Sequence, residues 1–299
     1  QAVTTLACAQ ELAEVFAARD FVPILFRENL SACAVQVECT MYYFTREELG
    51  EDYEAALRLL LTDRVKKLTH DLKSLMRKLL EQGLPVDGFI FDTALAAYLL
   101  DATRGKYDLP AVAEAYGHFT LPSAADTTPE GVLFSAVAAV EAVYEPLLTQ
   151  LRQQGSDKLY FDVELPLCRV LAEMERDGVL VDRGALRSFG DMLCARISDC
   201  EALIYEVAGG EFNINSTKQL GELLFDKLKL PPVKKTKSGY STNAEVLEAL
   251  RDKHPVVQAI MDYRMLTKLK STYADGLQKE IATDGRIHTT FQNMVTATG

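Results

Sequence analysis

The stretch of residues 212–277 contains the signals that most restrict how this 299-residue chain can fold. Ser216 and Gln219 match the S-x-x-Q pattern of a capping box, in which two side chains satisfy free amides at a helix N-terminus. Thr242 and Glu245 form a second such pattern. Two consecutive prolines and a lysine-rich run separate the two patterns. The stretch is therefore predicted to form helical segments joined by a lysine-rich tip.

The lysine-rich tip lies in the only basic part of the chain. Residues 1–210 carry 19 Lys and Arg against 33 Asp and Glu, whereas residues 211–299 carry 13 against 10. The tip contains Lys234, Lys235 and Lys237. A charge run is often only a solvated loop, but this one stands beside a predicted helix N-terminus, which is a favourable place for an anion. Phosphate contact and simple solvation both remain open readings.

The last helix of the stretch is predicted to start after Pro255 and carries further cations. Arg264 and Lys268 are four residues apart and share one face of the helix, which suits contacts with neighbouring phosphates. Lys270 points to another face. Upstream, Lys218 stands in the first turn of the first capped helix, where it adds to the positive helix end. These cations make the C-terminal third the candidate phosphate-binding surface.

The length and composition are those of a globular protein with two domains. No apolar run approaches 18 residues and no signal peptide opens the chain, so we expect a soluble protein without a membrane partner. Gln1 is not an initiator Met, which is expected of a fragment of a longer protein. The six cysteines form no CxxC pair, so reduced thiols are expected, with no zinc ligand set and no cysteine nucleophile.

Residues 31–155 alternate between strand-like and helical patterns. Residues 31–45 are rich in β-branched and aromatic residues, which is typical of one or two strands. Residues 47–84 have the apolar spacing of two helices around a short VKKLTH strand. An apolar helix is predicted at 131–154, with Gly155 as its cap. The alternation predicts an α/β layer domain.

Two long helical patterns follow, at 163–178 and 183–210, joined by the short extended link VLVD. Both mix charged residues with an apolar stripe, so we read them as a structural stalk. The final run, residues 285–299, alternates polar and apolar residues as a strand does.

Several segments follow one another in a characteristic order: FDTALAAYLLDATRGKYDLPAVAEAYG, ELPLCRVLAEMERDGVLVD, FNINSTKQLGELLF, YRMLTKLKSTYADGL and GRIHTTFQNMVTATG. In these motifs the chain resembles the family A DNA polymerases, the family of bacterial DNA polymerase I. The resemblance implies an α/β, ribonuclease H-like but degenerate 3′–5′ exonuclease domain at 1–158. It further implies the N-terminal part of the polymerase domain at 159–299, with a mainly α-helical thumb at about 183–283 and the first strand of the palm within 284–299.

A nuclease of this family holds two metal ions with acidic residues, because one carboxylate cannot hold two divalent ions. The resemblance places the first pair, Asp-x-Glu on the opening strand, at Gln36 and Glu38, where only the Glu is kept. The other two acidic positions fall on Leu75 and Ala138. One carboxylate of four is left. The domain is therefore expected to keep the nuclease fold without binding the metal pair or cleaving DNA.

Three polar residues near these positions have other readings. His70 and Asp71 are either a residual site or a surface or capping feature at a helix start. Asp92 stands at a strand end before a helix and is predicted to be an N-cap, whose side chain accepts a free backbone amide.

The thumb of this family grips the backbone of primer–template DNA, and such contacts position DNA without reading its sequence. The resemblance implies this role for several residues of the chain, and the neighbouring cations complete the candidate set. The candidate DNA-binding residues are Asn213, Ser216, Lys218, Lys234, Lys235, Lys237, Thr242, Arg264, Lys268 and Lys270.

The sequence therefore predicts part of a template-directed DNA polymerase of replication and repair, located in the bacterial cytoplasm with the nucleoid. Primer–template DNA is the expected partner. Deoxynucleoside triphosphates and Mg²⁺ are expected only for the longer protein, and no catalytic or metal-binding residue is assigned in this chain, because residues 160–299 offer no suitable carboxylate pair. Two alternatives stay open: an active 3′–5′ exonuclease, and a non-catalytic scaffold that docks another protein.

Overall fold

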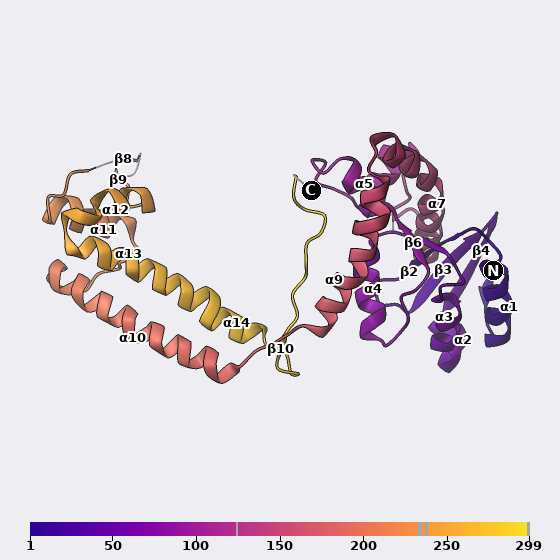
Figure 1. The fold of residues 1–299 in the computed structure, drawn as a ribbon, viewed down its shortest axis with the longest axis horizontal. Coiled ribbons are helices and arrows are strands. Elements are labelled where there is room, and N and C mark those ends of the chain that lie inside the picture. Colours follow the sequence, from indigo (N-terminus) through magenta and orange to yellow (C-terminus); the bar gives the residue numbers. More distant parts are fainter. Residues whose placement is uncertain (124, 233–234, 237–238, 298–299) are drawn as a thin grey trace. The chain divides into compact units, whose positions relative to one another are not determined.

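The computed structural model describes residues 1–123, 125–232, 235–236 and 239–297. The chain divides into two compact units, drawn as ribbons in Figure 1. The α/β unit comprises residues 1–177 and the residues from Thr289 onward, and the helical unit comprises residues 178–288. The α/β unit thus continues past residue 158, where the sequence placed a domain boundary. The domain division itself stays a prediction.

A mixed sheet forms the centre of the α/β unit. Its strands are β1 (Ala2–Val3), β2 (Val22–Phe26), β3 (Ala32–Val37), β4 (Thr40–Thr45), β5 (Lys67–Thr69) and β6 (Phe89–Asp92), in the order β1-β4-β3-β2-β5-β6. Strand β3 runs antiparallel to β2 and β4, whereas β2, β5 and β6 run parallel. The predicted α/β class is confirmed, and residues 31–45 do form two strands.

Helices cover this sheet: α1 (Leu6–Ala17), α2 (Arg46–Leu49), α3 (Tyr53–Leu60), α4 (Leu72–Glu81), α5 (Thr93–Leu100), α6 (Leu109–Val112), α7 (Pro129–Gln154), α8 (Asp157–Leu159) and α9 (Leu165–Asp177). The π-helical turns Ala113–Gly117 and Tyr160–Glu164 continue α6 and precede α9. Helix α7 ends as predicted at Gly155, whose φ of 69° is a left-handed conformation that suits glycine.

Helix α7 begins two residues before the apolar helix predicted at 131–154. Among the described residues it is the one helix that meets the length and hydropathy of a membrane span. It packs against β2, β3 and β5, and residues such as Val137, Val140 and Val143 are fully buried there. A core helix of a globular domain passes the same test, because it too must be apolar. The absence of a membrane partner stays a prediction.

Strand β5 carries a buried lysine that the sequence pattern did not single out. The Nζ atom of Lys67 donates to the carbonyl oxygens of Leu60, Thr62 and Val65 at 2.6–2.9 Å. Burial lowers the pKa of this amine to about 7. Gly88 passes so close that a Cβ atom there would lie 2.5 Å from Nζ and 2.3 Å from the Thr62 oxygen. Lysine and glycine together therefore fix the turn between α3 and β5.

The helical unit is built on two long helices that lie side by side (Figure 1). Its elements are β7 (Val179–Leu180), α10 (Arg183–Ala208), α11 (Thr217–Gly221), β8 (Lys235–Thr236), β9 (Gly239–Tyr240), α12 (Ala244–Leu250), α13 (Pro255–Lys268), α14 (Asp275–Glu280) and β10 (Arg286–Ile287). A π-helical segment, Leu269–Ala274, joins α13 to α14. A compact core at one end contains Leu220, Leu224, Leu247 and Ile260.

Two expectations about element ends were wrong. Pro255 is itself the first residue of α13, capped by His254, which fits the preference of proline for the first helical turn. The strand predicted over 285–299 is only Arg286–Ile287, paired antiparallel with β7. Strand β7 offers just two residues as partners, so residues 289–297 have no ladder to join there and run as an irregular segment.

Candidate functional site

A groove of ≈ 920 Å³ in the helical unit brings together three of the candidate DNA-binding residues, Lys218, Thr242 and Arg264. The groove lies between the beginnings of α11 and α12, and Tyr240 also lines it. Two carboxylates, Glu222 and Asp226, stand in the same wall. The two predicted helix starts therefore do meet, but the groove has mixed rather than purely positive charge.

The first capping box is half right. The Ser216 hydroxyl accepts from the backbone amide of Gln219 at 3.4 Å, as predicted. The Gln219 side chain, however, accepts from the backbone amide of Asn213 at 2.8 Å, not from that of Ser216. The Ser216 amide donates instead to the Asn213 carbonyl at 2.9 Å. The tight turn before α11 uses this amide, which leaves the glutamine free to hold Asn213.

The second capping box is wrong. The N-cap of α12 is Asn243, whose side-chain oxygen accepts from the Val246 amide at 3.0 Å. Thr242 is 3% exposed and faces α13. Its carbonyl oxygen accepts a hydrogen bond from Arg264, and its hydroxyl lies 3.3 Å from the same guanidinium. A local S/T-x-x-E pattern does not show whether the threonine is buried. Thr242 is buried against Arg264, and the neighbouring Asn243 caps α12 instead.

The cation row on α13 is only partly available to a ligand. Arg264 is half-buried against Thr242, and burial lowers its pKa. Lys268, one turn later, is exposed. Lys270 points elsewhere, as expected, and forms an ion pair of 2.6 Å with Asp275. Of the row, Lys268 is the side chain with its charge open to solvent.

The lysine-rich tip adds little to this picture. Lys234 and Lys237 lie outside the described residues, and of Lys235 only the backbone is described, as part of β8.

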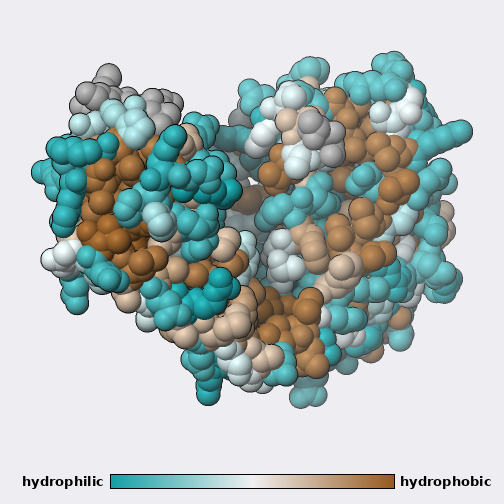
Figure 2. Space-filling model, turned by 60° about the vertical axis from the view of Figure 1, so that its left-hand side comes forward, coloured by the Kyte–Doolittle hydropathy of each residue, from teal (hydrophilic) through white to brown (hydrophobic). Residues whose placement is uncertain are grey.

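Elsewhere the surface of the helical unit, on the left in Figure 2, includes a broad apolar patch beside hydrophilic side chains. Exposed apolar side chains of α10 and α13 include Met192, Leu203 and Met265. The unit is thus not uniformly cationic.

The four positions compared with nuclease carboxylates do not converge. Register pairs Ile24 of β2 with Val35 of β3, so Gln36 lies beside the beginning of β2. Glu38 follows in the β3–β4 turn, where it pairs with Arg19 at 2.8 Å. Leu75, in contrast, borders a cleft at the other end of the sheet. The placement of Gln36 and Glu38 at a metal centre with Leu75 is therefore wrong, because the antiparallel β3 carries them away from it.

The cleft that contains Leu75 holds two carboxylates of its own. It lies where β2 and β5 end and is lined by Phe26, Glu28, His70 and Asp71. Glu28 comes two residues after Phe26, the last residue of β2, so one of the two carboxylates stands just beyond the end of this strand.

Ala138 and Gln36 have other surroundings. Ala138 is exposed on α7. The amide of Gln36 donates to Glu141, also on α7, at 2.6 Å. Within the described residues no group of three or more His, Cys, Asp or Glu side chains is arranged to hold a metal ion. The residues present therefore do not fit a two-metal nuclease centre.

Asp92 is the N-cap that the sequence predicted, and it caps two helices. Its carboxylate accepts from the amides of Ala94 in α5, Leu72 in α4 and Asp71, each at 2.9 Å. Burial raises its pKa to about 6 although these amides favour the charged form. The hydroxyl of buried Tyr160 binds both the amide and the carbonyl of Asp92, at 2.7 and 3.0 Å.

His70 and Asp71 are not a plain surface feature. The Nδ1 atom of His70 lies 2.7 Å from the Thr93 hydroxyl, and burial lowers the His70 pKa to about 4. Asp71 occupies the N-cap position of α4, but its side chain makes no capping bond, because Asp92 supplies it. Both residues also border a cavity of ≈ 560 Å³ in the α/β unit.

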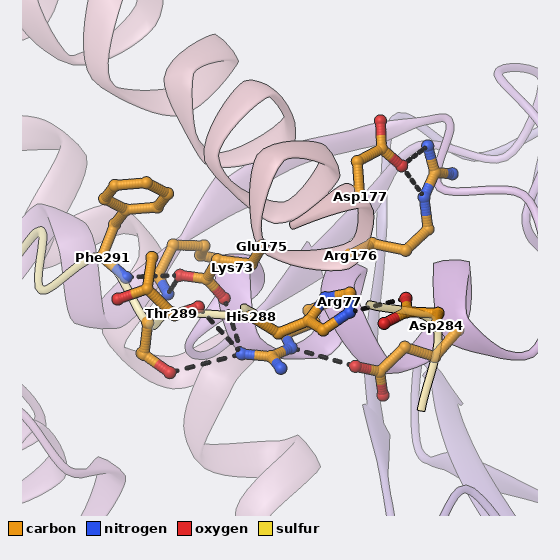
Figure 3. A network of polar contacts seen from close by, with 11 residues as sticks. Lys73, Arg77, Glu175, Arg176, Asp177, Asp284, His288, Thr289 and Phe291 are labelled. Atoms are coloured by element: carbon orange, nitrogen blue, oxygen red, sulfur yellow. Dashed lines mark hydrogen bonds and ion pairs between the residues drawn. The ribbon is translucent and has the colours of Figure 1, made fainter. Parts of the chain in front are cut away.

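A buried ion-pair network ties α4 to α9 (Figure 3). Glu175 of α9 is 1% exposed and lies between two cations of α4, Lys73 at 2.5 Å and Arg77 at 3.3 Å. The same carboxylate accepts from the backbone amide of Phe291 at 2.8 Å. Sequence periodicity read α9 as a stalk and gave no sign of this network.

Known protein families match both units of the chain, in the same order along the sequence. Residues 26–126 match the family model of the DNA polymerase I ribonuclease H-like domain, and residues 183–299 match the model of DNA polymerase family A. The chain is 41% identical over 271 residues to DNA polymerase I of Geobacillus stearothermophilus and 38% identical to that of Bacillus subtilis (strain 168). Each match covers 86% of this chain and 31% of the relative.

A solved structure shows the same relationship in three dimensions. The POL domain of Pol1 from M. smegmatis, in complex with DNA primer-template and dNTP, superposes with a TM-score of 0.82 at 33% identity. The superposition covers 97% of this chain and 52% of that one. The chain thus spans about a third of the length of its curated relatives. It belongs to the family A DNA polymerases, as a portion of the bacterial DNA polymerase I type with the ribonuclease H-like domain and part of the polymerase region.

Proposed function

We propose that the chain serves in template-directed DNA synthesis during replication and repair, and that its helical unit holds the backbone of primer–template DNA. The observation that carries the proposal is the groove where Lys218 and the beginnings of α11 and α12 meet, in a unit whose structural neighbour is complexed with primer-template DNA. Lys268 extends the cationic surface along α13.

The proposed contact is electrostatic and independent of base sequence. Asn213 and Ser216 hold the turn before α11 and Arg264 holds Thr242, so the phosphate contacts fall to Lys218 and Lys268. Lys234, Lys235, Lys237 and Lys270 remain proposed contacts that the geometry leaves untested. With so few phosphate contacts, we expect weak binding that falls steeply with salt.

Catalysis is assigned to parts of the longer relatives that this chain does not cover. We propose that Mg²⁺ and deoxynucleoside triphosphates act there, because the described residues offer no cluster that fits a divalent ion pair. The α/β unit is proposed to be inactive as a nuclease. A 5′-labelled single strand incubated with Mn²⁺ is expected to keep its length. Shortening that is lost in Glu28→Gln and kept in Glu38→Gln would overturn this proposal.

The DNA contact is tested by fluorescence anisotropy with a primer–template duplex over a range of salt. Each phosphate contact contributes about 0.9 to the slope of log K against log salt, so Lys218→Ala combined with Lys268→Ala should lower the slope by about 2. Arg187→Ala combined with Lys279→Ala is the matched control, since both residues are exposed on α10 and α14, rather than on α11 or α13, and the charge change is the same. Equal losses in the two double variants would refute a contact centred on the groove.

A further inference from the structure

The irregular segment from Thr289 to Thr296 is fastened to the α/β unit by polar contacts along its length. Phe291 donates its amide to Glu175 at 2.8 Å. The hydroxyl of Tyr98 in α5 donates to the Thr296 carbonyl at 3.0 Å. Met294 packs against the main hydrophobic core. All these residues belong to one compact unit, so the contacts are internal to it.

Arg77 adds a second anchor at the beginning of the segment. Its Nη1 atom lies 3.4 Å from the Thr289 carbonyl and 3.3 Å from the Thr290 hydroxyl. The same guanidinium pairs with Glu175, as Figure 3 shows, and with Glu81 at 3.0 Å. One arginine of α4 therefore contacts the segment and the buried carboxylate at once.

Glu175 is the centre of this arrangement. A carboxylate that is 1% exposed is strongly unfavourable unless charges and hydrogen bonds surround it. Lys73, itself 5% exposed, and Arg77 supply the charges. The Phe291 amide supplies a further donor, and hydrogen bonds to an ionised acceptor are the strong ones. Holding the segment thus helps to satisfy a charge that the unit has already buried.

The segment also lines a cavity of the α/β unit. Thr290 to Met294 form one wall of the ≈ 560 Å³ cavity, and His70, Asp71 and Asp108 lie on the others. Part of the wall of this cavity is therefore supplied by the segment itself.

We propose that the α/β unit, in place of nuclease chemistry, is a docking platform for the segment 289–296, and that Glu175 is the residue that fastens it. This inference rests on the proposed function for its meaning, because the segment directly follows the helical unit that is proposed to hold DNA. The docking itself is independent of DNA, because the platform is the surface of α4, α5 and α9 and its occupant is a segment of the same chain.

Hydrogen exchange followed by mass spectrometry on the whole chain tests the proposal. Glu175→Gln removes the charge and keeps the shape, and peptides covering 289–296 are expected to exchange at least tenfold faster. Glu173→Gln is the matched control on the same helix, because the Glu173 side chain is 39% exposed and pairs only with Arg169 among the described residues. Peptides of β2 and β3 should stay protected in both variants.

A second variant keeps the test decisive if Glu175→Gln unfolds the unit. Tyr98→Phe removes only a hydroxyl, so the ring contact with Tyr107 is kept while the bond to Thr296 is lost. Faster exchange confined to the end of the segment supports docking. Wild-type exchange in 289–296 at the rate of an unstructured peptide, or unchanged rates in both variants, would overturn the inference. Neither measurement involves DNA, so a failure of the proposed DNA binding can be told apart from a failure of the proposed docking.

Discussion

The hydroxyl of Tyr160 should be one of the most important single groups for the stability of the α/β unit. Tyr160 is fully buried, and its hydroxyl both accepts from the Asp92 amide and donates to the Asp92 carbonyl. Asp92 in turn caps α4 and α5. Tyr160→Phe removes the hydroxyl and leaves both backbone groups buried without their partner.

The magnitude follows from the cost of unmade buried hydrogen bonds. Each orphaned group costs about 1–3 kcal/mol, and the phenylalanine recovers part of this because no hydroxyl is desolvated. The expected loss is therefore about 2–3 kcal/mol of unfolding free energy for the α/β unit. In a domain of this size that lowers the melting temperature by about 4–12 °C.

Urea unfolding followed by far-UV circular dichroism measures the loss, with a fixed m-value as the check that only stability has changed. Tyr144→Phe is the matched control. Tyr144 packs against Phe91 as Tyr160 does, but its hydroxyl has no protein partner among the described residues. If both variants lose the same free energy, or if Tyr160→Phe loses less than about 0.5 kcal/mol, the reasoning from the Asp92 bonds is wrong.

Two further predictions concern the same unit. The pKa of His70 is lowered from 6.5 to about 4 in the folded protein, so the unfolded chain takes up a proton here more readily. The contribution of neutral His70 to the unfolding free energy is fully present above pH 6.5, and about 3 kcal/mol is lost as the pH falls to 4. The raised pKa of Asp92 has the opposite effect on stability, but it is present in both the wild type and His70→Gln and cancels in their comparison. The difference in unfolding free energy between the two should therefore change by about 3 kcal/mol between pH 6.5 and pH 4. A difference that stays constant with pH would contradict the prediction. Gly88→Ala should cost about 3–5 kcal/mol in thermal unfolding, because strain at a φ of 77° adds to overlap with Thr62 and Lys67. Gly105→Ala has a similar φ of 74° and open space, so it should cost only about 1 kcal/mol, and equal costs would refute the overlap.

Local signals in the sequence were enough for much of the fold. Asp92 before an apolar helix and Gly155 after one were assigned correctly, because capping depends on residues within one helical turn. The two strands within 31–45 and the short strand at Lys67 were also found from residue type and spacing. These features need no knowledge of what packs against them.

Features that depend on distant partners were missed. Gln36 and Phe26 stand at opposite ends of the sheet only because β3 turns back on β2, which no local pattern shows. Thr242 fits a capping box by sequence, yet Arg264, 22 residues later, buries it. Glu175 looks like a surface charge on an amphipathic helix until Lys73 and Arg77 are placed beside it, about a hundred residues earlier in the chain.

The division of the chain has a consequence for its synthesis. The helical unit, residues 178–288, is inserted between two parts of the α/β unit. During translation Glu175 leaves the ribosome 116 residues before Phe291, so Lys73 and Arg77 neutralise it alone until the segment beyond the helical unit has been made. The fold of the α/β unit is therefore completed only after the whole helical unit has been synthesised.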